Sequence, residues 1–158
     1  MITKIRRARP EEADQLTELA HAAKRHWRYP ESWIQLWCDD LTLSAPFIRA
    51  HPVFCAVRRA ELVGFYALSR SGAEFELEHL WVHPRHMGGG VGSKLFRHAV
   101  SRIRRQQGAA LRITSDPNAQ EFYRRMGARR IGRVRSTPAG RHLPRLLLDL
   151  RQDSRARR

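Results

Sequence analysis

Cysteine is scarce in this sequence: only Cys38 and Cys55 occur among 158 residues, and their spacing matches no metal-binding motif. A domain of this length can bury an adequate hydrophobic core without disulfides, so both thiols are expected to be reduced, as is usual in the cytoplasm. Hydrophobic runs are short as well. None reaches the roughly 20 apolar residues of a membrane-spanning helix, and residues 1–4 lead into charged sequence instead of a signal peptide. We therefore expect a cytoplasmic protein with no membrane partner.

Lysine is also rare, yet the net charge is +15. Only Lys4, Lys24 and Lys94 are lysine, so arginine supplies the other 27 of the 30 basic residues. A field of this sign attracts polyanions, which include nucleic acid and the phosphates of a nucleotide. An arginine-rich composition inherited from a GC-rich genome would look the same, and no aromatic-plus-basic RNA motif accompanies the charge. The charge alone leaves nucleic acid open as a partner without favouring it.

A glycine-rich turn lies between an apolar segment ending at Val82 and a helical pattern beginning at Val91. Glycine tolerates positive φ and the close approach of a ligand, and the N–H groups at a helix N-terminus suit a phosphate. The turn fits neither the dinucleotide-binding pattern nor the Walker pattern, because Ser93 stands where both require glycine. The turn is therefore either a plain surface turn or an anion site of another kind.

The segment from Val82 to Leu95 instead resembles the acyl-CoA-binding signature of the GNAT superfamily of N-acetyltransferases. That signature is Gln/Arg-x-x-Gly-x-Gly/Ala after a strand that ends near Val-x-Pro. Gly90 and Gly92 match it, whereas Met87 replaces the usual Gln or Arg. The resemblance implies acetyl-CoA as co-substrate, with backbone amides on its pyrophosphate. The residues implied to bind it are Leu80, Trp81, Val82, Met87, Gly88, Gly89, Gly90, Val91, Gly92, Ser93, Asn118 and Tyr123.

A second segment, Asp116–Ala128, resembles another signature of the same family, N-x-x-A-x-x-x-Y-x-x-x-G-F. The match is closest at Phe122-Tyr123 and Gly127. In well-studied relatives this tyrosine protonates the departing CoA thiolate, so the resemblance implies Tyr123 as the general acid and Asn118 as a contact to the pantetheine. Without the resemblance, Tyr123 would be a half-buried packing residue on the apolar stripe of its helix.

An amine acceptor also needs a base, because only about one molecule in 2,500 of an amine with pKa 10.4 is uncharged at pH 7. Glu76 and Glu78 precede the glycine turn on one predicted strand, and strict alternation places both on one face with Leu80, opposite His79 and Trp81. We expect one of the two carboxylates to act as base or to relay a proton through water. The alternative is that both pair with arginines on a solvated face.

Three histidines, His79, His83 and His86, are further candidates for the base, and the pattern does not select one. Their spacing matches no standard metal-ligand motif, so no metal site is expected. The two cysteines have no activating neighbours, which argues against an acyl-enzyme intermediate.

The order of the expected elements, β-α-α-β-β-β-α-β-α-β-β, matches the GNAT fold along nearly the whole chain. We expect an α/β (α+β) domain over residues 1–150, with a mostly antiparallel mixed sheet of about six to seven strands flanked by about four helices. Residues 151–158 read as a basic, flexible tail. The expected strands are Ile2–Arg7, Pro52–Val57, Leu62–Leu68, Glu74–Val82, Ala109–Thr114, Ala128–Arg135 and His142–Leu150. The helices are expected after Pro10, with Trp27 on the apolar face, after Pro30, from Val91 to Ile103, and from Pro117 to Met126 with Asp116 as N-cap. The apolar face expected for the third helix consists of Val91, Leu95, Phe96, Ala99, Val100 and Ile103.

The resulting expectation is an N-acetyltransferase in which a primary amine, on a small molecule or a protein, attacks acetyl-CoA directly in a ternary complex. A non-catalytic acyl-CoA sensor and a basic nucleic-acid-associated domain are the alternatives with this fold. The sequence names neither the acceptor nor the acyl-chain preference, and a monomer and a homodimer both fit. The acceptor pocket is expected near the loop 136–141 and the aromatic residues Trp27, Tyr29, Trp33 and Trp37, which could equally pack between helices.

Overall fold

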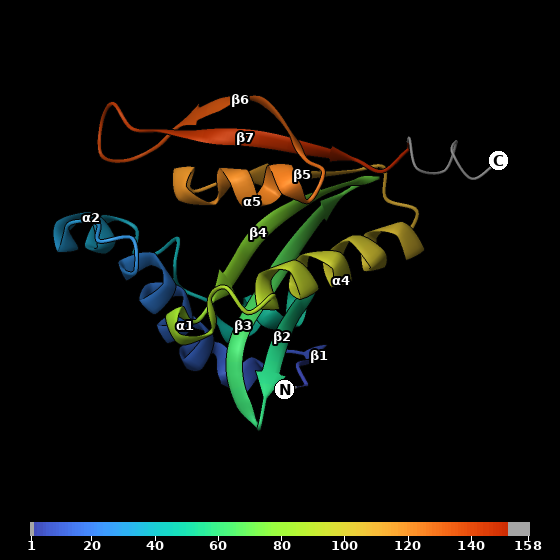
Figure 1. Cartoon of the computed structure of the whole chain (residues 1–158), viewed down its shortest axis with the longest axis horizontal. Coiled ribbons are helices and arrows are strands. Elements are labelled where there is room, and N and C mark those ends of the chain that lie inside the picture. Colours follow the sequence, from blue (N-terminus) through green and yellow to red (C-terminus); the bar gives the residue numbers. More distant parts are fainter. Residues whose placement is uncertain (1, 152–158) are drawn as a thin grey trace.

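A computed structural model describes residues 2–151, which form a seven-stranded sheet with the strand order β1-β2-β3-β4-β5-β7-β6 (Figure 1). All neighbouring strands are antiparallel except β4 and β5, which are parallel. The mixed, mostly antiparallel sheet expected from the sequence is therefore confirmed. The strands are β1 (Lys4–Arg7), β2 (Val53–Arg58), β3 (Glu61–Ser71), β4 (Glu74–Val82), β5 (Ala110–Thr114), β6 (Arg129–Arg135) and β7 (His142–Asp149).

Five α-helices and three 3-10 turns complete the described part, one helix more than the sequence predicted. The missed helix is α3 (Ala45–Ala50), which has only six residues and is too short for a periodic pattern. The Ser44 hydroxyl caps it by accepting a hydrogen bond from the N–H of Phe47. The other helices are α1 (Ala13–Arg25), α2 (Glu31–Leu36), α4 (Val91–Arg105) and α5 (Gln120–Arg125), and the 3-10 turns are η1 (Pro10–Glu12), η2 (Pro84–His86) and η3 (Pro117–Ala119).

Each face of the sheet buries its own hydrophobic cluster. Helix α4 packs against β2, β3 and β4 on one face, whereas α1 packs against β3 and β4 on the other. The apolar stripe predicted for α4 is buried along its whole length, at Val91, Leu95, Phe96, Ala99, Val100 and Ile103. Burial of such side chains contributes roughly 1.5–3 kcal/mol each, so α4 is firmly fixed behind the glycine turn.

Two details at helix ends differ from the prediction. Trp27 was placed on the apolar face of the first helix, but it lies beyond the end of α1 and is 40% exposed. The segment expected to form one helix after Asp116 begins as the 3-10 turn η3 and becomes α-helical only at Gln120. Asp116 caps that turn as predicted, since its carboxylate accepts from the N–H of Asn118 at 2.9 Å.

Within residues 2–151, no helix combines the length and the hydrophobicity required to cross a membrane. The tail predicted over 151–158 lies outside the described residues apart from Arg151.

Candidate functional site

Strands β4 and β5 separate halfway along β4. Their parallel pairing begins with Glu74 opposite Ala110 and ends with Leu77 opposite Ile113, whereas β4 continues to Val82. On its other edge β4 stays paired with β3 up to that last residue. The edge of residues 78–82 that faces β5 therefore carries backbone N–H and C=O groups without a strand partner, as the edge of a sheet does.

A cavity of 590 Å³ lies at this divergence, and it collects nearly all the residues predicted to bind acetyl-CoA. Its lining combines the free edge of β4, the glycine turn, the first turn of α4 and one side of η3 and α5. Gly89 is the one predicted contact that does not line it, and its carbonyl accepts from the guanidinium of Arg58 at 3.3 Å. The predicted contacts on the cavity are Leu80, Trp81, Val82, Met87, Gly88, Gly90, Val91, Gly92, Ser93, Asn118 and Tyr123.

The glycine turn needs glycine for its backbone shape. Gly88 and Gly90 both have φ of +81°, and a Cβ at either would meet no atom within 4 Å, so conformation and not crowding restricts these positions. Gly90 is also the N-cap of the 15-residue helix α4. The turn thus directs the unpaired N–H groups of that helix at the cavity, which is a suitable arrangement for a phosphate.

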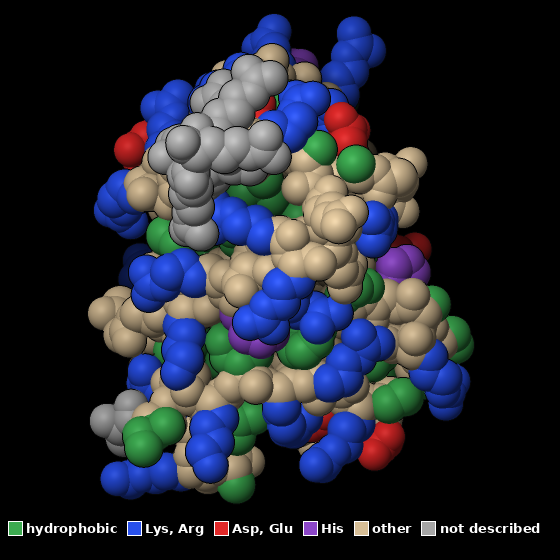
Figure 2. All heavy atoms as spheres, turned by 90° about the vertical axis from the view of Figure 1, so that its right-hand side faces the viewer, with side chains coloured by type: hydrophobic (Ala, Val, Ile, Leu, Met, Phe, Trp, Pro, Cys, Tyr) green, Lys and Arg blue, Asp and Glu red, His purple; other side chains and the backbone are tan. Residues whose placement is uncertain are grey.

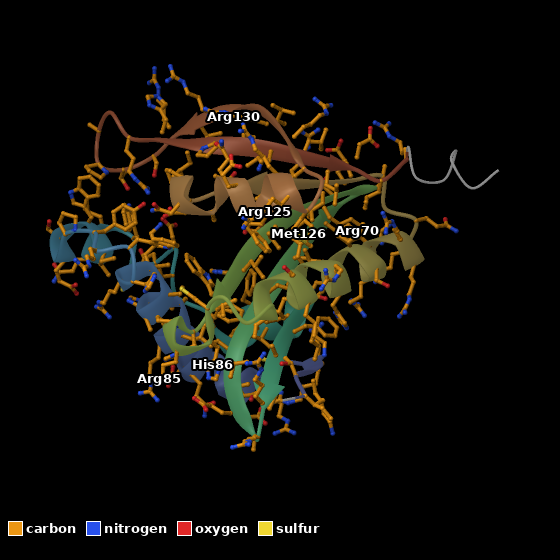
Figure 3. The ribbon with its side chains drawn as sticks, in the orientation of Figure 1. Arg70, Arg85, His86, Arg125, Met126 and Arg130 are labelled. Carbon is orange, nitrogen blue, oxygen red and sulfur yellow. The ribbon has the colours of Figure 1, made fainter. Side chains whose placement is uncertain are left out.

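Two basic side chains that were not predicted to bind acetyl-CoA also line the cavity. Figure 3 shows them on different elements, His86 on η2 and Arg125 on α5. Nothing in the sequence distinguishes Arg125 from the other arginines. It lines the same cavity as Met87, which stands where the signature usually has Gln or Arg.

Tyr123 is 6% exposed and packs its ring against Phe96 and Phe122, at centroid distances of 5.8 and 5.2 Å. It therefore has the packing role that its helical position suggests. It also lines the cavity, and within residues 2–151 its hydroxyl makes no hydrogen bond. Burial raises the pKa of this phenol, so the hydroxyl keeps its proton at neutral pH.

The prediction of which side chains of β4 share a face of the sheet is wrong, because β4 has a β-bulge at Glu78. Ala67 of β3 pairs with His79, but the next residue, Leu68, pairs with Leu77, so Glu78 has no partner. The extra residue shifts the alternation by one position. Leu80 and Val82 consequently join the hydrophobic cluster under α4 together with Phe75 and Leu77. Trp81 packs on the opposite face.

The two glutamates end up with different partners. Arg145 donates to both carboxylate oxygens of Glu76, with Nη1 at 2.8 Å from Oε2, so the arginine-paired alternative holds for Glu76. Glu78 instead accepts from the Ser69 hydroxyl at 2.6 Å. Glu78 lines the 590 Å³ cavity and Glu76 does not.

His79 sits in a setting unsuited to a base. The indole N–H of Trp81 donates to its Nδ1 at 3.0 Å, so a neutral His79 carries its proton on Nε2. Burial lowers the pKa of His79 to about 4. The ring is therefore neutral at pH 7, and its unprotonated nitrogen is already occupied by the indole.

Stability is expected to fall between pH 6.5 and pH 4 because of His79. The unfolded chain binds a proton at this histidine below about pH 6.5, while the folded chain binds it only near pH 4. The expected loss over this interval is up to about 3 kcal/mol. Urea unfolding at pH 7 and pH 5, between which about 2 kcal/mol of this loss is expected, measures it in wild type and in His79→Asn, which keeps an acceptor for the indole but does not titrate. An equal loss in both proteins would show that His79 is not the cause.

A second cavity, of 690 Å³, meets the first at β4. Both glutamates, the residues after α2 and the ends of the 136–141 loop line it. Of the four aromatic residues expected near the acceptor pocket, only Trp37 lines this cavity, whereas Trp27 lines the first one. The six lining residues common to both cavities are Leu77, Glu78, His79, Trp81, Thr114 and Asp116. A third cavity, of 740 Å³ between α1 and the β2–β3 turn, contains one candidate for the base, His83, and none of the predicted acetyl-CoA-binding residues.

Asp116 lies where the two cavities meet and binds four side chains. Its carboxylate is 2.5 Å from Lys24 Nζ and 3.7 Å from the Arg141 guanidinium, and it accepts from the Tyr29 hydroxyl and the Asn118 amide at 3.0 and 2.9 Å. The side chains of Lys24 and Asp116 are each only 9% exposed. Burial would raise the pKa of Asp116, but Lys24 and the other donors hold it below its usual value. The sequence suggested none of this, because the partners are up to 92 positions apart.

Comparison with known proteins agrees with this geometry. A family model described as the acetyltransferase (GNAT) domain matches residues 49–127, which is half of the chain. A search among curated proteins gave no significant match.

Solved structures share the fold at low sequence identity. The PaiA N-acetyltransferase of Thermoplasma acidophilum, solved in complex with coenzyme A, superposes with a TM-score of 0.77 at 18% identity, over 94% of this chain and 99% of that one. A GCN5-related N-acetyltransferase from Rhodopseudomonas palustris gives 0.78 at 21% identity, over 95% and 99%. The ribosomal-protein-S18-alanine N-acetyltransferase of Escherichia coli gives 0.73 at 16% identity, over 94% of both chains.

Proposed function

Because the chain belongs to the GNAT family of acetyltransferases, we propose that it transfers the acetyl group of acetyl-CoA to a primary amine. The observation that carries the proposal is the 590 Å³ cavity, which joins the free edge of β4, the glycine turn and Tyr123. A base and an acid for amine acetylation both line it, as Glu78 and Tyr123. Because both groups are present, turnover is favoured over an acyl-CoA sensor without catalysis.

The acetyl-CoA site is proposed in two parts. The N–H groups of residues 88–93, which cover the glycine turn and the start of α4, hold the pyrophosphate, and the positive charge of Arg125 assists them. The unpaired edge of residues 80–82 hydrogen-bonds the pantetheine in the manner of an added strand. A backbone N–H of this edge also stabilises the oxyanion that forms on the acetyl carbonyl.

The proposed reaction is direct attack by the amine in a ternary complex. Glu78, which borders both cavities, removes a proton from the amine, and the Ser69 hydroxyl fixes its carboxylate. The amine nitrogen adds to the acetyl carbonyl, which forms the C–N bond and the tetrahedral oxyanion. Collapse of this intermediate restores the carbonyl and breaks the C–S bond, and Tyr123 donates its proton toward the leaving thiolate. Neither cysteine lines these cavities, and burial raises the pKa of Cys55 to about 12, so an acyl-enzyme route has no support.

Saturating acetyl-CoA is expected to raise Tm by roughly 5–10 °C. Ligand at about 100 times its dissociation constant adds about 2.7 kcal/mol to the free energy of unfolding. ATP and a sulfated polyanion serve as controls, since a protein of net charge +15 can bind many anions. An equal shift with every polyanion would contradict a dedicated site and bring forward the nucleic-acid-associated alternative.

Two alanine substitutions locate the site by a matched comparison. Gly90 and Gly72 both have positive φ and open space where a Cβ would lie, so alanine strains both by a similar amount, roughly 1–2 kcal/mol. Only Gly90 borders the cavity, whereas Gly72 lies in the β3–β4 turn. Gly90→Ala is expected to lose most of the Tm increase with acetyl-CoA, and Gly72→Ala to retain it. Retention in both variants would place the cofactor elsewhere.

A further inference from the structure

The 690 Å³ cavity is acidic on a strongly basic chain. Its lining holds five of the chain's 15 acidic residues but only two basic ones, Lys24 and Arg141. The five acidic residues are Asp39, Asp40, Glu76, Glu78 and Asp116.

Some of this negative charge is neutralised. Asp116 is paired with both basic residues of the lining, and Glu76 is paired with Arg145. The other three carboxylates, on Asp39, Asp40 and Glu78, form no ion pair within residues 2–151, although the Lys24 ammonium interacts electrostatically with Asp40. Asp39 and Asp40 are exposed, so they lie where a ligand entering from solvent would meet them.

The walls of the same cavity include aromatic rings that already hold cations. The Lys24 ammonium lies 4.5 Å from the centroid of Trp37 and 6.0 Å from that of Trp81, and Arg141 lies 4.4 Å from the Trp37 ring. Aromatic faces beside unpaired carboxylates are a favourable environment for an ammonium group.

We propose that this cavity selects a small amine that carries a second positive charge. The second charge lies against Asp39 and Asp40 while the reacting amine reaches Glu78. The volume of 690 Å³ falls in the usual range for small-molecule sites, roughly 300–1,000 Å³, which favours a small molecule over a protein chain. This inference rests on the proposed amine acetylation and names the class of its acceptor.

The basic exterior does not contradict a cationic acceptor. Figure 2 shows Lys and Arg side chains spread over the face at the C-terminal end of α4, with few acidic ones. In Figure 1, α2 and the β6–β7 loop lie at the opposite end of the molecule, and the residues that follow α2 and the ends of that loop line the cavity. At physiological ionic strength, exposed charges act over only about 8 Å, so the carboxylates of the lining dominate at the cavity itself.

A matched pair of amines tests the inference. Aminohexyl-trimethylammonium and its neutral isostere, with a tert-butyl group in place of the trimethylammonium, have the same shape and one reactive amine each. With acetyl-CoA saturating, we expect kcat/KM to be roughly tenfold higher for the charged amine, since exposed ion pairs each contribute only modestly. Asp39→Asn combined with Asp40→Asn should bring the ratio close to one.

The control variant removes two negative charges at positions outside both cavities. Glu11 and Asp14 are exposed and line neither of the two cavities, so Glu11→Gln with Asp14→Asn should keep the tenfold ratio.

A ratio near one in wild type, with both amines acetylated, overturns the inference and leaves the proposed function standing. If neither amine is acetylated although acetyl-CoA binds, the proposed function is contradicted. Calorimetry can then still measure how tightly each amine binds to the protein with coenzyme A. Tighter binding of the charged amine supports the inference that the cavity selects a second positive charge, and equal binding overturns it.

Discussion

Replacing Tyr123 with phenylalanine is expected to lower kcat about 100-fold, which corresponds to about 2.7 kcal/mol of lost transition-state stabilisation. The substitution removes one hydroxyl and keeps the ring, so the contacts with Phe96 and Phe122 remain and the fold is preserved. Without the hydroxyl, the CoA thiolate must leave unprotonated. The dissociation constant for acetyl-CoA should change little, because the proposed site binds acetyl-CoA mainly through the glycine turn and the edge of β4.

The raised pKa of Tyr123 bears on how large the expected loss of kcat in Tyr123→Phe is. The phenol stays protonated over the whole pH range of an assay, so the acid is always present in its active form. The same shift makes it a reluctant donor, since a thiol has a pKa of about 8.5 and the phenol holds its proton more tightly. We therefore expect a rate effect near the lower end of the usual 10²–10⁴-fold range for general acids.

Tyr66 provides the matched control. It is fully buried, its pKa is also raised by burial, and its hydroxyl hydrogen-bonds the Nδ1 of His98 at 2.7 Å. It lines none of the three cavities. Tyr66→Phe should thus lower stability by about 1 kcal/mol with kcat unchanged. Equal kcat in Tyr123→Phe and wild type, measured by release of CoA, would reduce Tyr123 to a packing residue.

Local sequence signals predicted the scaffold of the site well. The bounds of β4, Glu74–Val82, follow from a β-rich run closed by a turn on each side, and the structure reproduces them. The glycine turn was recognisable because Gly88 and Gly90 occupy backbone conformations that other residues avoid. Both signals lie within a few residues of the feature they predict.

Features that depend on the neighbouring strand or on distant partners were not predictable. The alternation rule assumes a regular ladder, and the bulge at Glu78 breaks it through a register shift set jointly with β3. The cluster around Asp116 joins residues from α1, the segment after it and the 136–141 loop, whose closeness exists only in the folded chain. The N-cap role of Asp116 was predicted because it needs only the next two residues.

Asp116→Ala is expected to destabilise the protein by about 3–5 kcal/mol, because it leaves the Lys24 ammonium buried without a carboxylate. For a chain of this size the corresponding fall in Tm is on the order of 10 °C. Lys24→Met should cost less, since Asp116 keeps Arg141, Tyr29 and Asn118 as partners. Adding Lys24→Met to Asp116→Ala should recover part of the loss, because the unpaired buried charge is then gone.

The pH dependence of the destabilisation by Asp116→Ala distinguishes loss of the buried Lys24–Asp116 ion pair from simple loss of packing. The pKa of Asp116 is lower in the folded chain than the 3.9 of an unfolded aspartate, so its contribution is present above about pH 4 and disappears as the pH falls through the folded value. Urea unfolding curves of Asp116→Ala and wild type should therefore converge in acid. Glu31→Ala, which breaks an ion pair with Arg25 whose side chains are 51% and 59% exposed, should cost 1 kcal/mol or less. If Asp116→Ala cost as little, the Lys24–Asp116 pair could not be the buried support of the wall between the two cavities.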